Sequence, residues 1–118
     1  MFIVCCIFAL LETVAYGVGS WTIMYLYIWP LLVFIVLMLK PIVRDCFLIW
    51  AVVSGTFGLC FGALCTLVYF PFGWAYMVVY FSSGFPWDIL HSITNFIIMI
   101  ALGNPLYKAL RRVINETR

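Results

Sequence analysis

Charged residues are scarce in this sequence, and their scarcity excludes a water-soluble domain. Asp, Glu, Lys and Arg make up 8% of the 118 residues, whereas hydrophobic types make up 68% and the mean hydropathy is +1.23. A soluble domain carries about 25% charged residues. The run from Cys46 to Trp87 contains no charged residue, and it is too long for one buried core helix. We therefore expect a single membrane domain that comprises residues 1–118.

Motifs for catalysis are also absent. The five cysteines include no C-x-x-C pair, His91 is the only histidine, and the chain has no glycine-rich phosphate loop or nucleophile–base pair. One His and one nearby Asp supply too few ligands for a metal ion. No basic stripe before the C-terminal tail could hold a nucleic acid. We expect no enzyme activity, no catalytic residue, no cofactor, no metal and no nucleic-acid partner.

Hydropathy divides the chain into about four apolar segments, which predicts an all-α integral membrane helical bundle. The predicted spans are residues 2–16, 22–39, 46–69 and 87–102. The apolar piece 74–85 is shorter than the roughly 20 residues that a span needs. It follows a Pro-Gly turn, and Ser82-Ser83-Gly84 should break it before Pro86, so we expect a short re-entrant or interfacial segment. Gly103-Asn104-Pro105 should close the last span.

Basic residues predict the orientation of these spans. With four spans, two clusters fall on one side of the membrane, whereas a fifth span would separate them. The clusters are Lys40 with Arg44, and Lys108, Arg111, Arg112 and Arg118. Because basic flanks face the cytoplasm, we expect a multi-pass protein of the plasma membrane with both termini in the cytoplasm. Residues 105–118 should form an amphipathic helix at the membrane surface.

Polar residues cluster at the start of the last predicted span. Asp88, His91 and Asn95 stand at i, i+3 and i+7, so they share one face of a helix. Ionisable groups within a membrane usually face an interior or a path. Two interpretations stay open: the three side chains form the polar wall of a ligand pocket, or they tie this helix to its neighbours.

Aromatic residues crowd the outer side of the predicted bundle. Trp74, Tyr76 and Trp87 lie in the dense group that follows Tyr69. Part of this group is the ordinary aromatic belt at a membrane surface. A stacking wall for a flat organic ligand is the second interpretation.

Two further features concern helix packing and proton coupling. Ser54, Gly58 and Gly62 recur every four residues, a spacing that lets two helix backbones approach closely. The partner helix could belong to this chain or to another subunit. Glu12 is the one charge in the first apolar segment, and a lone carboxylate in a membrane is a candidate for proton coupling.

The chain after Arg44 resembles a known family. It contains Gly84, Pro86, Asp88, His91 and Asn95 in a Gly-x-Pro-x-Asp-x-x-His-x-x-x-Asn run, followed by a Pro-Leu-x-x-x-Leu tail at Pro105, Leu106 and Leu110. Both patterns are similar to the C-terminal end of S components. These are the substrate-binding membrane subunits of bacterial energy-coupling factor (ECF) vitamin transporters.

This resemblance implies a subunit that captures a vitamin or similar small nutrient from outside. It would work with a transmembrane T component and cytoplasmic ATPases. Asp88, His91 and Asn95 would bind the ligand or brace its pocket, and Trp74, Tyr76 and Trp87 would stack on it. S components have six helices, whereas this chain has room for about four. The resemblance therefore implies that the first two helices of the family are missing here.

Two other function classes remain open. Small multidrug resistance proteins are four-helix proton-coupled exporters of similar length, and Glu12 would serve as their membrane carboxylate does. A membrane assembly subunit without transport is the third class. Its sign would be an Asp88–His91 face fully used in hydrogen bonds between helices.

Overall fold

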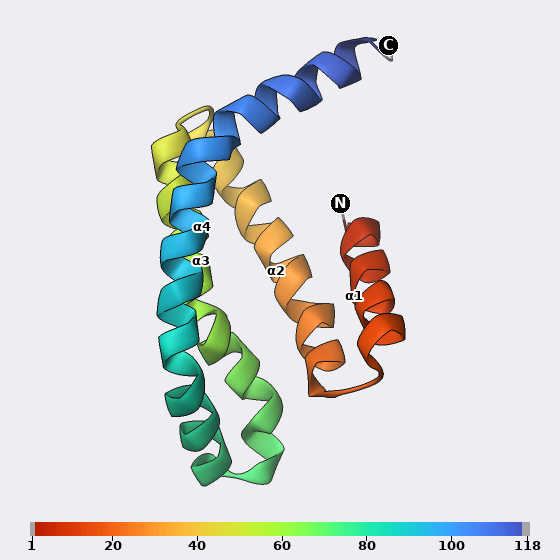
Figure 1. Ribbon diagram of the computed structural model, residues 1–118, viewed down its shortest axis with the longest axis vertical. Helices are drawn as coiled ribbons and strands as arrows, with labels where there is room; N and C mark the ends of the chain where they lie inside the picture. The colour runs from red at the N-terminus through yellow and green to blue at the C-terminus, as the bar shows by residue number, and fades with distance from the viewer. Residues whose placement is uncertain (1, 117–118) are drawn as a thin grey trace.

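The computed structural model describes residues 2–116, and these residues form helices joined by short turns (Figure 1). The α-helices are α1 (Phe2–Tyr16), α2 (Ser20–Val43), α3 (Phe47–Thr66) and α4 (Trp74–Glu116), and the 3-10 helix η1 (Leu67–Phe72) follows α3. No strand occurs between residues 2 and 116, which confirms the all-α prediction. Arg118, predicted in the C-terminal helix, lies outside the described residues.

Three of the described helical stretches are long and apolar enough to cross a membrane: Ser20–Val43, Phe47–Phe72 and Trp74–Glu116. The helix α1 is apolar but shorter. Its 15 residues reach only about 22 Å, against a hydrocarbon core of about 30 Å. It ends where Gly17 adopts a φ of +84° and its N–H donates to the carbonyl of Thr13 at 2.9 Å.

The helix α4 corrects two sequence predictions. It runs without a break from Trp74 to Glu116, so residues 74–85 are not a separate segment and Gly103-Asn104-Pro105 does not end the helix. Ser82 does not break it because its Oγ donates to the carbonyl of Val78 at 2.7 Å. Pro86 and Pro105 lie within the helix. Each proline removes one donor, which bends a helix when the turns on both sides hold.

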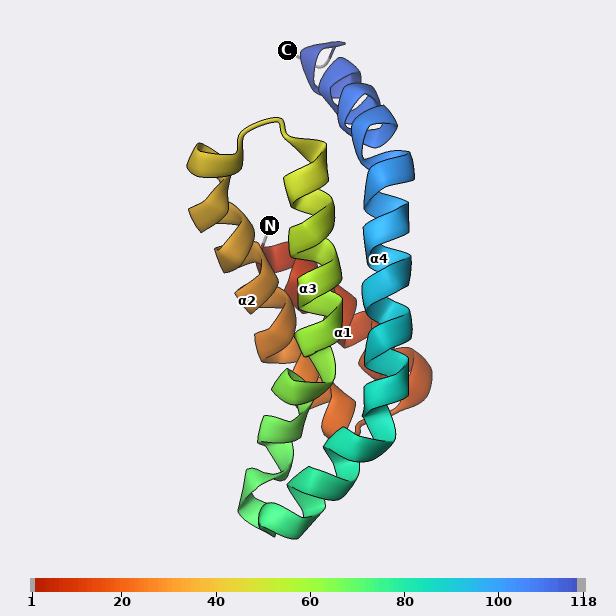
Figure 2. The ribbon, with the colours of Figure 1, turned by 90° about the vertical axis from the view of Figure 1, so that its left-hand side faces the viewer.

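The length of α4 follows from this continuity. Its 43 residues extend about 65 Å along the helix, roughly twice the thickness of a hydrocarbon core. Figure 2 shows the N-terminal part of α4 bending beneath α3, and Figure 1 shows its C-terminal part diverging from the other helices. The two ends of α4 therefore extend beyond the part that packs on α3.

The helices α3 and α4 lie antiparallel and side by side, α2 leans away from them, and α1 packs on α2 alone among the described elements (Figures 1 and 2). A small buried cluster joins Met24 and Ile28 of α2 to Cys65 of α3. Tyr27 ties the same helices together, because its hydroxyl donates to the carbonyl of Leu64 at 2.5 Å. The turn after α2 and the C-terminal part of α4 lie at the same end of the molecule (Figure 1). The described basic residues, Lys40 with Arg44 and Lys108 with Arg111 and Arg112, thus share one end of the molecule.

Candidate functional site

A glycine seam brings α3 against α4. Gly55, Gly58 and Gly62 are buried and face α4. A Cβ added at Gly58 would lie 2.9 Å from Nδ2 of Asn95, and one added at Gly62 would collide with Oδ2 of Asp88. The absence of side chains at these positions therefore creates the space that α4 occupies. The partner helix of the small-residue strip belongs to this chain.

Ser54 lies beside this seam rather than in it. It is half-buried and faces two hollows at the edges of α3 and α4. Gly55, one residue further on, takes the buried place instead. The seam thus follows positions i, i+3 and i+7 of α3, which share a face as closely as a four-residue repeat does.

Asp88 is the polar residue that α4 contributes to the seam. Its side chain is only 3% exposed, and its Oδ1 accepts a hydrogen bond from the backbone N–H of Gly62 at 3.0 Å. The carbonyl of Gly62 accepts a second bond from Oγ1 of Thr66 at 2.7 Å. The other carboxylate oxygen, Oδ2, is buried and has no partner among the described residues. One half of the carboxylate therefore braces the helices, and the other half is unsatisfied.

Trp87, His91 and Asn95 form a stripe beside the seam, since residues four apart lie above one another on a helix. Trp87 and His91 are exposed, and Asn95 is half-buried. The side chains of His91 and Asn95 make no hydrogen bond within residues 2–116. This stripe, here called the polar stripe, thus keeps its donors and acceptors available.

An aromatic cluster continues from the polar stripe into the bundle. The ring centroid of His91 lies 5.9 Å from that of Phe61, and the centroid of Phe61 lies 6.3 Å from that of Trp29 on α2. Trp29 in turn contacts Phe8 at 5.7 Å and Tyr25 at 5.8 Å. The indole N–H of Trp29 is buried without a hydrogen-bond partner in the described chain. The aromatic wall next to His91 therefore comes from α1, α2 and α3.

Sequence reasoning missed Phe61 and Trp29 as neighbours of His91. Phe61 precedes Gly62 in the sequence, so its place beside the seam could have been read from the glycine spacing. Trp29 carried a weaker signal, its i, i+4 spacing from Tyr25 on one helical face. Neither signal shows that the two rings meet, because that contact depends on how α2 leans on α3.

Trp74 and Tyr76 lie far from the polar stripe. Trp74 is 76% exposed and Tyr76 is 64% exposed, and the Tyr76 ring contacts Phe72 at 6.3 Å. From Trp74 to His91 the helix advances about 25 Å. The structure therefore groups Asp88, His91 and Asn95 with Trp87, and does not bring Trp74 or Tyr76 to them.

Glu12 lies in another part of the molecule. It is half-buried on α1 beside Tyr25. The next residue, Thr13, links α1 to α2 because its hydroxyl lies 3.2 Å from that of Thr22. Glu12 thus sits at the contact between α1 and α2, apart from Asp88.

Two hollows complete the geometry. A groove of about 990 Å³ lies at the basic end, and none of the predicted ligand-binding residues lines it. A smaller hollow of about 130 Å³ is lined by Asn95, together with Ser54 and Met99. Residues 2–116 contain no group of three or more His, Cys, Asp or Glu side chains that could hold a metal ion.

Comparisons with known proteins found no relative of this chain. No protein-family model, no curated protein and no solved structure matches the chain. The interpretation of the site therefore depends on its own geometry.

Proposed function

We propose that this chain is the membrane-embedded substrate-capture subunit of an ECF-type importer. It binds a vitamin or similar small nutrient from outside and passes it to an ATPase-driven module. One observation carries this proposal: the polar face at the seam is only partly used by the protein. Of its hydrogen-bonding groups, Oδ1 of Asp88 binds α3, while Oδ2 is buried without a partner in the described chain.

Unpaired polar groups are expensive in an apolar environment. A buried acceptor without a partner costs about 1–3 kcal/mol, and more when it is charged. An assembly subunit would be expected to use the whole face between its helices. The side chains of His91 and Asn95 instead make no hydrogen bond between residues 2 and 116. A ligand with complementary donors and acceptors would satisfy them, which favours capture over a purely structural role.

The aromatic residues beside the polar stripe suit a flat organic ligand. Phe61 and Trp87 flank His91 from α3 and from the same helix, so they offer apolar surface next to unpaired polar atoms. Trp74 and Tyr76, on the far side of Pro86, would reach such a ligand only after the outer part of α4 folds toward the stripe. We assign them to closure rather than to the first encounter.

We propose a topology of four membrane segments, in which the short helix α1 joins α2, α3 and α4. Both termini then lie in the cytoplasm. The basic residues of the turn after α2 and of the C-terminal part of α4 then face the cytoplasm. The outer part of α4 lies at the opposite surface, where a nutrient arrives. A T component and two ATPases would supply the energy, because the sequence has no nucleotide-binding motif.

Ligand retention tests the proposal. The full chain is purified in mild detergent, and native mass spectrometry and thermal shift are measured against a panel of water-soluble vitamins. We expect one vitamin to bind the wild type and to bind His91→Ala and Asn95→Ala at least tenfold more weakly. Ser82→Ala is the matched control, since Ser82 is exposed on the side of α4 opposite His91.

Two results would contradict the proposal. The first is a wild type that retains no vitamin and copurifies with no ATPase. The second is a proton-linked dye efflux that Glu12→Gln abolishes, since that result would establish the exporter. Loss of the vitamin in Ser82→Ala as well would show that the polar stripe is not the binding surface.

A further inference from the structure

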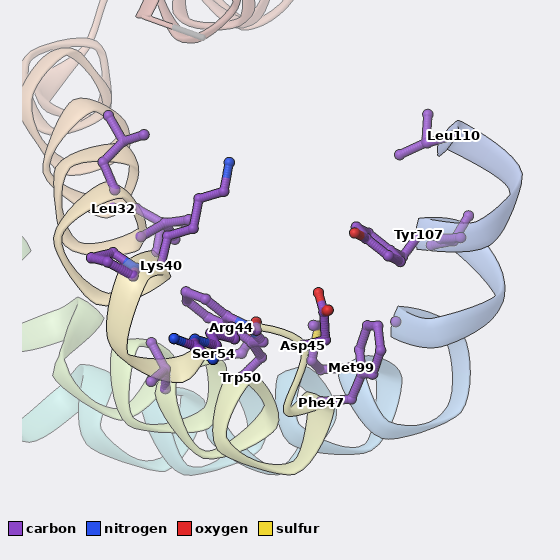
Figure 3. A pocket seen from close by; sticks show the side chains of 16 residues that line it. Leu32, Lys40, Arg44, Asp45, Phe47, Trp50, Ser54, Met99, Tyr107 and Leu110 are labelled. Carbon is purple, nitrogen blue, oxygen red and sulfur yellow. The ribbon is translucent and has the colours of Figure 1, made fainter. Parts of the chain in front are cut away.

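The groove at the basic end is separate from the polar stripe. It has a volume of about 990 Å³ and lies between the C-terminal half of α2, the start of α3 and the part of α4 near Gly103. Figure 3 shows its walls, with α2 on one side, α4 on the other and α3 as the floor. It exists because α2 leans away from α4 and because α4 diverges beyond Gly103 (Figure 1).

The groove is apolar at depth and charged at its rim. Leu32 and Val36 line its α2 wall, and Met99 and Leu106 line its α4 wall. Lys40 and Arg44 close its end near the turn after α2. The eight helical steps from Leu32 to Lys40 span about 12 Å along α2. A molecule that fills the groove therefore needs an apolar chain and, about 12 Å from its deep end, an anionic group.

The charges around the rim are mainly positive. Asp45 is the one acidic residue that lines the groove, against Lys40 and Arg44. Lys108, Arg111 and Arg112 follow Tyr107 on α4 within about one and a half turns, but they do not line the groove. The rim thus keeps a net positive charge in spite of Asp45.

The position of Arg44 is fixed by the backbone around it. Arg44 has a φ of +50°, its N–H donates to the carbonyl of Lys40 at 3.0 Å, and its own carbonyl accepts from Nε1 of Trp50 at 2.9 Å. A non-glycine residue in this conformation is uncommon and is held by its surroundings. The turn therefore keeps Arg44 at the rim, since Lys40 of α2 and Trp50 of α3 both bond to its backbone.

Tyr107 marks the level of the rim on the opposite wall. Its ring packs against Phe47 at 5.8 Å, and Figure 3 shows its hydroxyl directed toward the open centre, as is the amine of Lys40. Tyrosine is enriched where hydrocarbon meets headgroups, because its ring is apolar and its tip is polar. Along α2 and the turn after it, the lining thus changes from aliphatic at Leu32 and Val36 to basic at Lys40 and Arg44.

We propose that this groove binds one anionic phospholipid of the leaflet at the basic end. Its acyl chain lies along Leu32 and Met99, and its phosphate sits between Lys40 and Arg44. Charge complementarity decides the occupant: basic pockets between membrane helices bind anionic headgroups, and a zwitterionic lipid has no net charge to match this rim. The groove is open rather than enclosed, so a lipid enters it without opening the bundle. The inference does not depend on the proposed nutrient.

The test compares lipid retention among charge-matched variants. The full chain is reconstituted in nanodiscs of equal parts phosphatidylglycerol and phosphatidylcholine, then extracted, and bound lipid is identified by native mass spectrometry. We expect one retained phosphatidylglycerol in the wild type. Lys40→Gln and Arg44→Gln should each lower its enrichment over phosphatidylcholine about fivefold, the effect of one basic residue near an anionic surface.

Arg112→Gln is the matched control. It removes the same charge, but two residues turn a helix by about 200°, so Arg112 points away from the groove that Leu110 lines. We expect its lipid enrichment to equal that of the wild type. Val36→Phe fills the apolar part of the groove and should lower retention of both lipids.

Three results would overturn the inference. Equal retention of both lipids by the wild type would remove the role of charge. Equal effects of Lys40→Gln and Arg112→Gln would reduce it to the general attraction of a basic surface. The third result is that a copurifying membrane protein displaces the lipid. If Val36→Cys is then protected from a maleimide only in that complex, the groove is a site for a protein partner.

Discussion

Replacing Gly62 by alanine should separate α3 from α4. A Cβ at this position would collide with Oδ2 of Asp88. The carboxylate would have to leave the seam, and its 3.0 Å hydrogen bond from the N–H of Gly62 would break. This single methyl group thus tests both the close approach of the helices and the bridge that Asp88 makes.

The expected magnitude follows from three contributions. Overpacking costs about 1–3 kcal/mol, and loss of a hydrogen bond to a carboxylate costs about 1.5–3 kcal/mol. Alanine gains about 1 kcal/mol over glycine within a helix. Gly62→Ala should therefore lower the free energy of unfolding by about 1.5–5 kcal/mol.

Gly84→Ala provides the matched control. Gly84 also lies within a helix, but a Cβ added there would meet nothing within 4 Å. This variant should be more stable than the wild type by about 1 kcal/mol. Both variants and the wild type are unfolded in mixed micelles with increasing SDS and followed by circular dichroism. If Gly62→Ala proves as stable as Gly84→Ala, the seam described for α3 and α4 is refuted.

Four further variants probe the contacts between helices, each measured in the same SDS titration. Gly58→Ala should cost about 1–3 kcal/mol, because its Cβ would lie 2.9 Å from Nδ2 of Asn95 and 3.0 Å from the α4 backbone at His91 and Ser92; no loss would mean that α4 shifts freely there. Asp88→Asn keeps an oxygen that can accept from Gly62, so it should stay within about 1 kcal/mol of the wild type, whereas Asp88→Ala should lose about 2–3 kcal/mol. Equal losses would show that the carboxyl oxygen bonds nothing. Tyr27→Phe removes the bond to the carbonyl of Leu64 and should cost about 1 kcal/mol, while no change would place that hydroxyl in contact with solvent.

Hydropathy predicted the middle of the chain because lipid selects strongly on composition. The expected span 22–39 falls within α2, and the expected span 46–69 begins one residue before α3 and ends within η1. The glycine spacing likewise predicted a close helix contact, since only residues without side chains allow it. The sequence did not say which helix would fill that contact, because the answer depends on the antiparallel turn at η1.

Breaker residues misled the prediction for α4. Ser82, Gly84 and Pro86 end helices in water, where a freed carbonyl can bond to solvent. In an apolar environment a broken helix leaves unsatisfied backbone groups, so a bent helix is the better solution. That continuity also explains the distance of Trp74 from His91, which no local motif indicated.

The unbroken path of α4 has a mechanical consequence. The glycine seam holds α4 against α3 from Asp88 to Phe96, which leaves an arm of about 21 Å toward Trp74. Pro86 lies at the base of this arm and lacks the N–H that would stiffen the helix there. The arm can therefore bend at Pro86 while the packed part of the helix stays in place.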